Sequence, residues 1–398
     1  MSAAAAPVVV AGAGPVGLTA ALVLARAGVP VVVLERAEGL STASRASTFH
    51  PATLDLLSEL GVADELTALG RRVDRVQWRD LDQRVLAEIG YDLLAGRTAH
   101  PFRVHVEQSR LTPLLLHRLA ELPHADVLFA GELTGVSPHG SSVRVRYRDA
   151  AGRHTELETP YLLAADGGRS TVRRELGLPS QSRSYPSYAL RVVTDTPLDE
   201  LLPGLPPLAY VRDPRQSYSV LGMPDHWRLI FRIPNDVPPD RVTGERAVRA
   251  LLERGLPAVH GEVRVRDAHT YRLSSFVLPD YRAGRVLFAG DAAHLTSTAG
   301  GMNMNCGLHD AVAWGRTLAD VLLHGAGQEE LDATAHRRRS AVLDAVLPRS
   351  EQRTAGLAGG LAEAVAEVRR TAADPRLATD FLIEASLLDC APNRQLVT

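Results

Sequence analysis

The chain has 398 residues, of which 45% are hydrophobic and 23% charged, a composition typical of a globular protein with two or three domains. Its 44 basic residues are all arginine and nearly balance 46 acidic residues, which argues against a nucleic-acid-binding protein. The absence of lysine excludes Schiff-base catalysis and a lysine-dependent phosphate loop.

The two cysteines, Cys306 and Cys390, are too few for a disulfide framework or a zinc knuckle, so we expect a reducing, cytoplasmic location and no metal site. The first seven residues contain no basic residue, and the apolar run that follows is broken by Gly12 and Gly14. We therefore expect neither a signal peptide nor a membrane span.

A β-α-β unit is predicted at the N-terminus, with strands at residues 8–11 and 31–34 and a helix at 18–27. The first strand runs into Gly12-Ala13-Gly14-Pro15-Val16-Gly17, and Glu35 closes the second. In such a unit the glycines permit a tight turn, close approach of a pyrophosphate and close packing of helix on strand. The carboxylate at the end of the second strand accepts hydrogen bonds from an adenosine ribose.

Two later strands, at residues 161–165 and 285–289, run into Asp166-Gly167 and Gly290-Asp291. Either aspartate alone would be read as a helix N-cap. Between them, from about residue 185 to 271, clustered prolines and the alternation of Leu229, Phe231 and Ile233 predict an inserted sheet. A helix is predicted from about residue 308 to 323, and the chain is predicted to be helical from 331 onward.

Three motifs in this order resemble the fingerprints of the class A flavoprotein monooxygenases, FAD-dependent aromatic hydroxylases similar to para-hydroxybenzoate hydroxylase. They are the Gly12-to-Gly17 motif, Ala165-Asp166-Gly167 and Gly290-Asp291-Ala292-Ala293-His294. Residues 45–51 are similar to the loop of that family beside the flavin, and residues 107–111 to its mid-chain segment that touches the cofactor. The resemblance covers most of the chain.

The resemblance implies an α/β fold, with a Rossmann-like FAD-binding domain of the glutathione-reductase type, an inserted sheet-rich substrate domain and a helical C-terminus. The expected FAD-binding domain is discontinuous and comprises residues 1–75, 100–180 and 270–330. Residues 76–99 and 181–269 are expected to form the substrate-binding sheet domain, and residues 331–398 the C-terminal helices.

The same resemblance implies FAD as cofactor, NADH or NADPH as reductant and O2 as co-substrate. The expected reaction hydroxylates a phenolic or heteroaromatic small molecule through a flavin C4a-hydroperoxide. Backbone N–H groups of residues 300–305 are expected to face the flavin ring. The residues expected to bind the cofactor are Gly12, Gly14, Pro15, Val16, Gly17, Glu35, Arg36, Arg45, Gln108, Arg110, Asp166, Gly290, Asp291, Gly301, Met304 and Asn305.

Four residues are candidates for catalysis: His50, Thr298, Tyr218 and Arg232. His50 is interpreted either as a base for a phenolic substrate, because histidine titrates near neutral pH, or as a packing residue at a helix entry. His294 is expected to support the Gly-Asp loop. Since the strand register is not fixed by the sequence, the candidates for substrate contact remain a set: Tyr188, Arg191, Tyr210, Arg212, Tyr218, His226 and Arg232.

The chain departs from the pattern of the family after the Gly-Asp motif. Thr298 replaces the usual proline, and Asn303 replaces a glycine. Asparagine tolerates a positive φ, so we expect Asn303 to keep the backbone path. Cys306 is interpreted as a small packing residue. These departures leave open an alternative, a flavin-binding protein with altered or lost monooxygenation.

A related flavin halogenase is excluded on two grounds. That class uses a lysine, which this chain lacks, and a Trp-x-Trp-x-Ile-Pro segment. The nearest match here, residues 229–234, contains neither tryptophan. The sequence predicts no oligomeric state.

Overall fold

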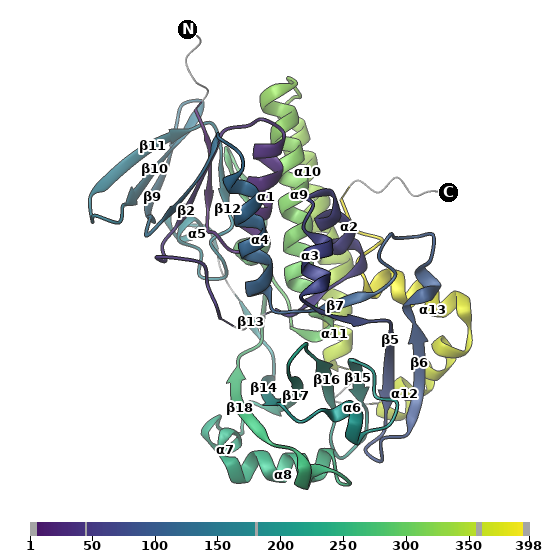
Figure 1. Cartoon of the computed structure of the whole chain (residues 1–398). Coiled ribbons are helices and arrows are strands. Elements are labelled where there is room, and N and C mark those ends of the chain that lie inside the picture. The colour runs from purple at the N-terminus through teal and green to yellow at the C-terminus, as the bar shows by residue number, and fades with distance from the viewer. Residues whose placement is uncertain (1–5, 44–45, 180–181, 356–359, 393–398) are drawn as a thin grey trace.

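The computed structural model in Figure 1 describes residues 6–43, 46–179, 182–355 and 360–392. Two sheets organise the chain: a six-stranded sheet with long helices in the upper part of the view, and a seven-stranded sheet in the lower part. Helices α12 (Leu361–Ala373) and α13 (Pro375–Ala385), drawn in yellow, lie beside the lower sheet. The predicted α/β fold with an inserted sheet and a helical C-terminus is confirmed, whereas the residue boundaries given for its parts stay a prediction.

The six-stranded sheet contains the predicted β-α-β unit. Its strands lie in the order β20 (Arg282–Ala283), β21 (Val286–Phe288), β12 (Leu162–Ala164), β1 (Val8–Ala11), β2 (Val31–Glu35) and β8 (Ala125–Phe129). All neighbours are parallel except β20 and β21. Strands of a parallel sheet are covered on both faces, which is why the valine runs of β1 and β2 predict buried strands.

Three helices pack on this sheet: α1 (Pro15–Arg26), α4 (Gln108–Ala120) and α9 (Met302–Leu323). The first lies against both others. At its start the helix approaches the preceding strand so closely that a Cβ added to Gly17 would lie 1.9 Å from the carbonyl oxygen of Gly12. Gly12 itself has φ +103°, a value that side-chain-bearing residues rarely adopt. The glycine motif is therefore a steric requirement of the fold.

Smaller elements surround the two sheets. They include a meander of β9 (Glu132–His139), β10 (Ser142–Arg148) and β11 (His154–Thr159), which our prediction did not include. The remaining short strands are β3 (Thr48–Phe49), β4 (Arg71–Val73), β7 (Arg103–His105), β13 (Arg183–Ser184), β19 (Ser274–Val277) and β22 (His294–Leu295). The short helices are α2 (Pro51–Glu59), α3 (Ala63–Ala68), α5 (Thr171–Glu175), η1 (Tyr91–Leu94), η3 (Gly290–Ala292) and η4 (Ala299–Gly301).

The seven-stranded sheet joins two segments far apart in the sequence. Its order is β18 (Val265–Tyr271), β14 (Ser187–Thr194), β17 (Trp227–Pro234), β16 (Tyr218–Gly222), β15 (Leu208–Val211), β5 (Arg75–Arg79) and β6 (Val85–Gly90). Helices α6 (Leu198–Leu201), α7 (Asp240–Thr243) and α8 (Glu245–Gly255) and the turn η2 (His260–Glu262) flank it in the lower part of Figure 1.

Alternation along β17 gives this sheet two different faces. Leu229, Phe231 and Ile233 join an apolar core that includes Leu252 of α8. The intervening residues, Arg228, Ile230 and Arg232, line a cavity on the opposite face. A period of two places successive side chains on opposite faces, so one strand both packs the core and carries cations into the cavity.

The C-terminal helices are α10 (Glu329–Ser340), η5 (Ala341–Val346), α11 (Leu347–Ala355), α12 (Leu361–Ala373) and α13 (Pro375–Ala385). Helix α9 begins at Met302, six residues before the predicted start near residue 308. Gly300 and Gly301, with φ of +85° and +66°, make the left-handed turn that brings the chain into the helix. The apolar pattern alone did not reveal this start, because the first turn carries two asparagines.

Alanine at position 17 tests the steric requirement. We expect Gly17→Ala to lower the free energy of unfolding by about 3 kcal/mol, the upper end for overpacking, because helix and strand must separate. Gly244→Ala is the control: this glycine is the N-cap of α8, but an added Cβ there meets nothing within 4 Å, and about 0.5 kcal/mol or less is expected. Urea unfolding measures both, and equal losses would contradict the steric explanation.

Candidate active site

The three sequence motifs meet at one edge of the six-stranded sheet. Ala11 of β1 pairs in register with Leu34 of β2 and Ala164 of β12, which in turn pairs with Phe288 of β21. Because these strands are parallel, the residues that follow each of them lie at the same edge, where ligands bind in open α/β sheets. A cavity of about 1190 Å³ begins at this edge and reaches the seven-stranded sheet.

Most residues predicted to bind a cofactor line this cavity: Gly12, Gly14, Pro15, Val16, Glu35, Arg36, Gln108, Asp166, Asp291, Gly301 and Met304. Four others do not line it: Gly17, Gly290 and Asn305, which are buried, and Arg110, which is exposed. Arg45 lies outside the described residues. The structure thus brings together most of the predicted set.

Glu35 and Asp166 present carboxylates to the cavity. Glu35 Oε2 accepts a hydrogen bond from the Ala13 backbone N–H at 2.8 Å, inside the glycine turn. Asp166 Oδ2 accepts from the N–H groups of Thr171 (2.7 Å) and Val172 (3.1 Å), so this oxygen does hold the start of α5. The other oxygen, Asp166 Oδ1, is buried and has no hydrogen-bond partner among the described residues. A buried acceptor of this kind calls for a donor that a ligand can supply.

Asn303 connects the Gly-Asp loop (residues 290–294) to helix α9. Its Nδ2 donates to Asp291 Oδ1 at 2.7 Å, and its Oδ1 lies 3.2 Å from His294 Nδ1. The expectation of a positive φ at Asn303 is wrong, because the residue lies in the first turn of α9 and the preceding glycines make the left-handed turn. The amide side chain, and not the backbone, explains why asparagine is useful here.

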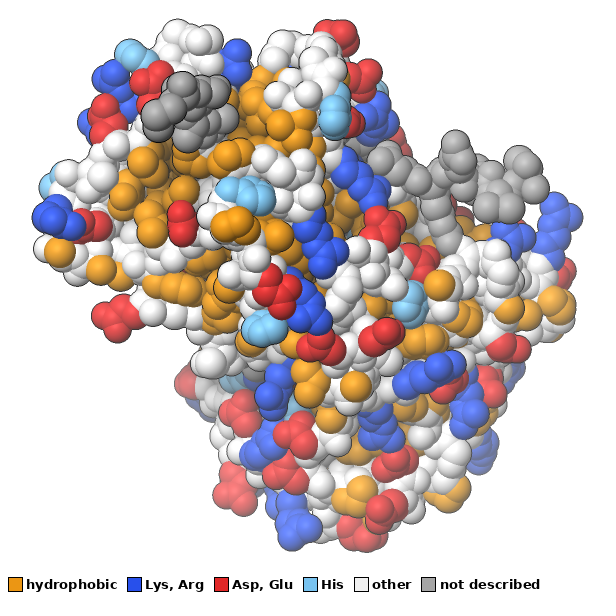
Figure 2. All heavy atoms as spheres, turned by 45° about the horizontal axis from the view of Figure 1, so that its top comes forward, with side chains coloured by type: hydrophobic (Ala, Val, Ile, Leu, Met, Phe, Trp, Pro, Cys, Tyr) orange, Lys and Arg blue, Asp and Glu red, His pale blue; other side chains and the backbone are white. Residues whose placement is uncertain are grey.

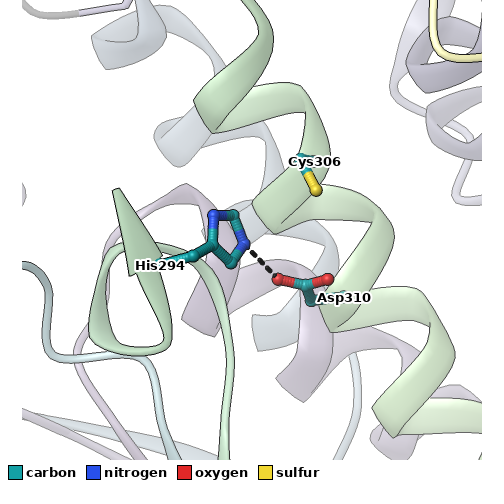
Figure 3. Close-up of side chains that lie close together, drawn as sticks. All are labelled: His294, Cys306 and Asp310. Atoms are coloured by element: carbon teal, nitrogen blue, oxygen red, sulfur yellow. Dashed lines mark hydrogen bonds and ion pairs between the residues drawn. The ribbon is translucent and has the colours of Figure 1, made fainter. Parts of the chain in front are cut away.

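A fully buried cluster supports the same loop (Figure 3). His294 Nε2 lies 2.7 Å from Asp310 Oδ2, which also accepts the Gly290 N–H at 3.1 Å. Arg338 of α10 donates from Nε to Asp310 Oδ1 at 2.8 Å and from Nη2 to Cys306 Sγ at 3.4 Å. His294, as expected, thus supports the Gly-Asp loop. One feature of the sequence indicates this cluster: Asp310 is an aspartate inside the otherwise apolar run of α9.

The cluster is an ion-pair network. Burial by itself would lower the pKa of His294, but Cys306 and Asp310 raise it well above its usual value. Burial opposes ionisation of Asp310 too, yet His294 and Arg338 hold its pKa below the usual value. Although the ligand atoms of His294, Cys306 and Asp310 lie within 4.8 Å of one another, the guanidinium of Arg338 already donates to Asp310 and to Cys306.

His50 and Asn305 lie behind the Gly300-Gly301 turn. Asn305 Nδ2 donates to the carbonyl oxygens of Thr48 (2.8 Å) and Gly301 (2.7 Å), and its Oδ1 accepts the His50 N–H at 3.0 Å. The His50 ring is fully buried and does not line the cavity. Burial, with Arg103 and Arg353 nearby, holds its pKa well below the usual value. This geometry matches the interpretation of His50 as a packing residue; the role of a base stays a prediction.

Thr298 and Arg232 lie together on the cavity wall, whereas Tyr218 turns its hydroxyl away. Arg232 Nη2 donates to Thr298 Oγ1 at 3.4 Å. The Tyr218 ring belongs to the apolar core under the sheet, and its hydroxyl donates to the Gly255 carbonyl at 2.6 Å. Burial raises the pKa of this phenol. The hydroxyl of Tyr218 therefore already has a hydrogen-bond partner in the core.

Of the substrate-contact candidates, Arg191, Tyr210, Arg212, Tyr218 and Arg232 line the cavity, and Tyr188 and His226 do not. Sequence reasoning missed Trp78 and Phe381, which form an aromatic wall with Tyr210; the Trp78 ring centroid lies 5.9 Å from that of Tyr210 and 5.7 Å from that of Phe381. These three residues come from β5, β15 and α13. No local motif predicts that they meet, because only the tertiary fold brings them together.

Replacement of the buried carboxylate tests the cluster. We expect Asp310→Asn to lower the free energy of unfolding by about 3–5 kcal/mol, because two buried cations lose their counter-charge. The control, Asp332→Asn, removes the exposed partner of Arg282 and should cost about 1 kcal/mol or less. Urea unfolding at neutral pH measures both.

The difference in free energy of unfolding between the wild type and Asp310→Asn should depend on pH. The folded-state pKa of Asp310 is lowered, so its contribution is present above the unfolded pKa and is lost as the pH falls through the lower folded value. The raised pKa of His294 gives a contribution present below its unfolded pKa and lost as the pH rises through the folded value. The free energy of unfolding is measured against pH for the wild type and for Asp310→Asn. If the two curves stay parallel on acidification below the usual aspartate pKa, Asp310 is not the buried carboxylate that stabilises the cluster.

Comparison with known proteins agrees with the geometry. The profile of the FAD binding domain family matches residues 5–350. The 6-methylpretetramide 4-monooxygenase of Streptomyces rimosus is 35% identical over 336 residues, 83% of this chain, and the match covers 58% of that relative. The crystal structure of p-nitrophenol 4-monooxygenase from Pseudomonas putida DLL-E4 has a TM-score of 0.90 at 26% identity, covering 98% of this chain and 99% of that one.

A third comparison includes ligands. The ternary complex of aklavinone-11 hydroxylase with FAD and aklavinone has a TM-score of 0.76 at 28% identity, covering 90% of this chain and 70% of that one. The order of the motifs, their meeting at one sheet edge and these matches lead to one conclusion: the chain belongs to the FAD binding domain family, among the class A flavoprotein monooxygenases.

Proposed function

We propose that this protein is an FAD- and NAD(P)H-dependent monooxygenase that hydroxylates an aromatic small molecule. The observation that carries the proposal is one continuous cavity, which begins at the edge of the six-stranded sheet where the three motifs meet and reaches an aromatic wall at the seven-stranded sheet. A flavin extended along it would have its adenosine at Glu35 and its ring near the Gly300-Gly301 turn. The aromatic reactions of the relatives named above support the same assignment.

The residues at the first end fit FAD. The N-terminus of α1 has no side-chain cap, so its N–H groups and the positive end of its dipole are available to a diphosphate. A Cβ added to Gly14 meets nothing within 4 Å, so the backbone there is open to the cavity. Glu35 would accept hydrogen bonds from the ribose, and the partnerless Asp166 Oδ1 would accept one from a hydroxyl of the cofactor.

Bound FAD would supply the chemistry that transfers two electrons from a nicotinamide reductant to O2 and one oxygen atom to the aromatic substrate. The balanced reaction converts ArH, O2, NAD(P)H and H⁺ into ArOH, NAD(P)⁺ and H2O. The chain's own residues position and shield the reactants. Gly300 and Gly301 hold a backbone turn at the cavity wall, and Asn305 fixes that turn from behind. The wall of Trp78, Tyr210 and Phe381 offers aromatic faces and excludes water.

The ribose contact gives a binding test. We expect Glu35→Gln to weaken FAD binding by roughly tenfold, because charged hydrogen bonds to the ribose become neutral. Glu38→Gln is the control, since this glutamate is three residues away, exposed and outside the cavity. Equilibrium titration of the protein with FAD, with circular dichroism to verify folding, measures the effect. Unchanged affinity in a folded Glu35→Gln variant would remove Glu35 from the site.

Turnover separates hydroxylation from the alternative of flavin binding without monooxygenation. With FAD, NADH or NADPH, and a panel of mono- and polycyclic phenols, we expect substrate-stimulated NAD(P)H oxidation. Under ¹⁸O2, mass spectrometry should find one labelled oxygen in the product. FAD retention with no stimulated oxidation and no labelled product across the panel would favour the alternative, and a failure to bind FAD at all would contradict both.

A further inference from the structure

Four arginines reach the cavity from four different elements. Arg103 belongs to β7, Arg212 follows β15, Arg232 belongs to β17 and Arg353 to α11, and all four line the cavity. Only the second and third were among the sequence candidates. They are gathered at the seven-stranded sheet and the C-terminal helices, away from the glycine motif that would hold a diphosphate.

Contacts with one loop locate two of these guanidinium groups. Arg232 Nη2 lies 3.4 Å from Thr298 Oγ1, and Arg353 Nη1 lies 3.6 Å from Met302 Sδ. Arg353 Nη1 would also lie 2.2 Å from a Cβ added to Gly300. Both cations are therefore held against the turn beside which the flavin ring is expected.

Among the described residues, none of the four forms an ion pair within 4.0 Å, and the residues outside the description include no aspartate or glutamate. Their hydrogen-bond partners are neutral: Arg103 donates to the Ala385 carbonyl at 2.8 Å and Arg212 to the Val211 carbonyl at 3.1 Å. Arg232 Nη1 and Arg103 Nε are buried without a partner. Three other arginines of the same cavity, Arg191, Arg228 and Arg349, pair with Asp267, Glu107 and Asp389. The remaining arginines of the lining are Arg36, Arg169 and Arg272, which lie outside this group of four.

The four cations act on one another. Burial lowers the pKa of Arg212 to about 10, Tyr210 opposes this shift, and Arg232 and Arg353 add to it. Burial lowers the pKa of Arg353 too, and Arg103 contributes. Because an uncompensated buried charge is costly, the binding of an anion in this part of the cavity lowers the free energy.

Two of the cations flank the aromatic wall. The Arg212 guanidinium carbon lies 5.0 Å from the Tyr210 ring centroid, and that of Arg353 lies 5.9 Å from the Phe381 ring centroid. Trp78 contacts both rings. A planar ring against this wall would carry its acidic substituent to a guanidinium, whose fork matches the two oxygens of a carboxylate.

We propose that Arg103, Arg212, Arg232 and Arg353 form an anion subsite and that the substrate is a planar aromatic acid, bearing a carboxylate or an equally acidic ionised oxygen substituent. The inference rests on the proposed function and narrows its substrate class. In this proposal the anion that these four cations bind is the substrate and not the cofactor.

Calorimetric titration of the oxidised FAD-loaded protein tests the proposal without turnover. The probes are pairs of an aromatic acid and its amide, with one aromatic ring or with two or three fused rings. One such pair is 3-hydroxy-2-naphthoic acid and 3-hydroxy-2-naphthamide. We expect at least one acid to bind tenfold or more tightly than its amide. Arg212→Gln and Arg353→Gln should each reduce that preference to less than threefold. Arg215→Gln should retain it, because this nearby arginine is exposed and pairs with Asp213.

The outcomes separate the two proposals. Acids that bind no more tightly than amides, or that do not bind at all, would overturn the anion subsite. So would a loss of FAD affinity in Arg212→Gln and Arg353→Gln with an unchanged acid preference, since the cations would then serve the cofactor. An acid that binds through these arginines but yields no ¹⁸O-labelled product would leave the subsite in place and count against hydroxylation.

Discussion

The geometry of the cavity depends on one buried carboxylate. Asp310 lies in the middle of α9 and is bound at once by the Gly290 N–H, by His294 and by Arg338 of α10. Through these contacts the loop after β21 is fixed to two helices. Since buried ionic groups persist only when fully paired, the loop cannot shift without leaving a charge unpaired. The position of Asp291 at the cavity edge follows, because Asn303 of the same helix also binds it.

What the sequence predicted well are the features set by the backbone. A glycine at position 17 is required because a Cβ would meet a carbonyl oxygen, and the valine runs of β1 and β2 are buried on both faces. Both constraints act over a few residues, so a local pattern carries them. Parallel pairing then brings the residues after β1, β12 and β21 to one edge, which explains why three separate motifs identify one site.

What the sequence could not predict are contacts that depend on strand register and tertiary packing. On β17, shifting the register by one residue would exchange Phe231 for Arg232 in the cavity wall. Trp78, Tyr210 and Phe381 meet only because β5 pairs in parallel with β15 and α13 packs nearby. A backbone argument fails at Asn303, because this residue acts through its side chain.

The absence of lysine gives the cavity its electrostatic character. A buried lysine without a counter-ion can release its proton, because burial shifts its pKa strongly downward. An arginine keeps its proton, and even for Arg212 the lowered pKa of about 10 leaves the guanidinium charged at neutral pH. The cavity therefore cannot relieve its repulsion by deprotonation, and among the described residues the cavity arginines that pair with carboxylates are others, such as Arg191, Arg228 and Arg349. On the face shown in Figure 2, by contrast, acidic and basic side chains are interspersed, so opposite charges lie near each other there. An excess of positive charge inside the cavity favours an anionic aromatic molecule over its neutral analogue.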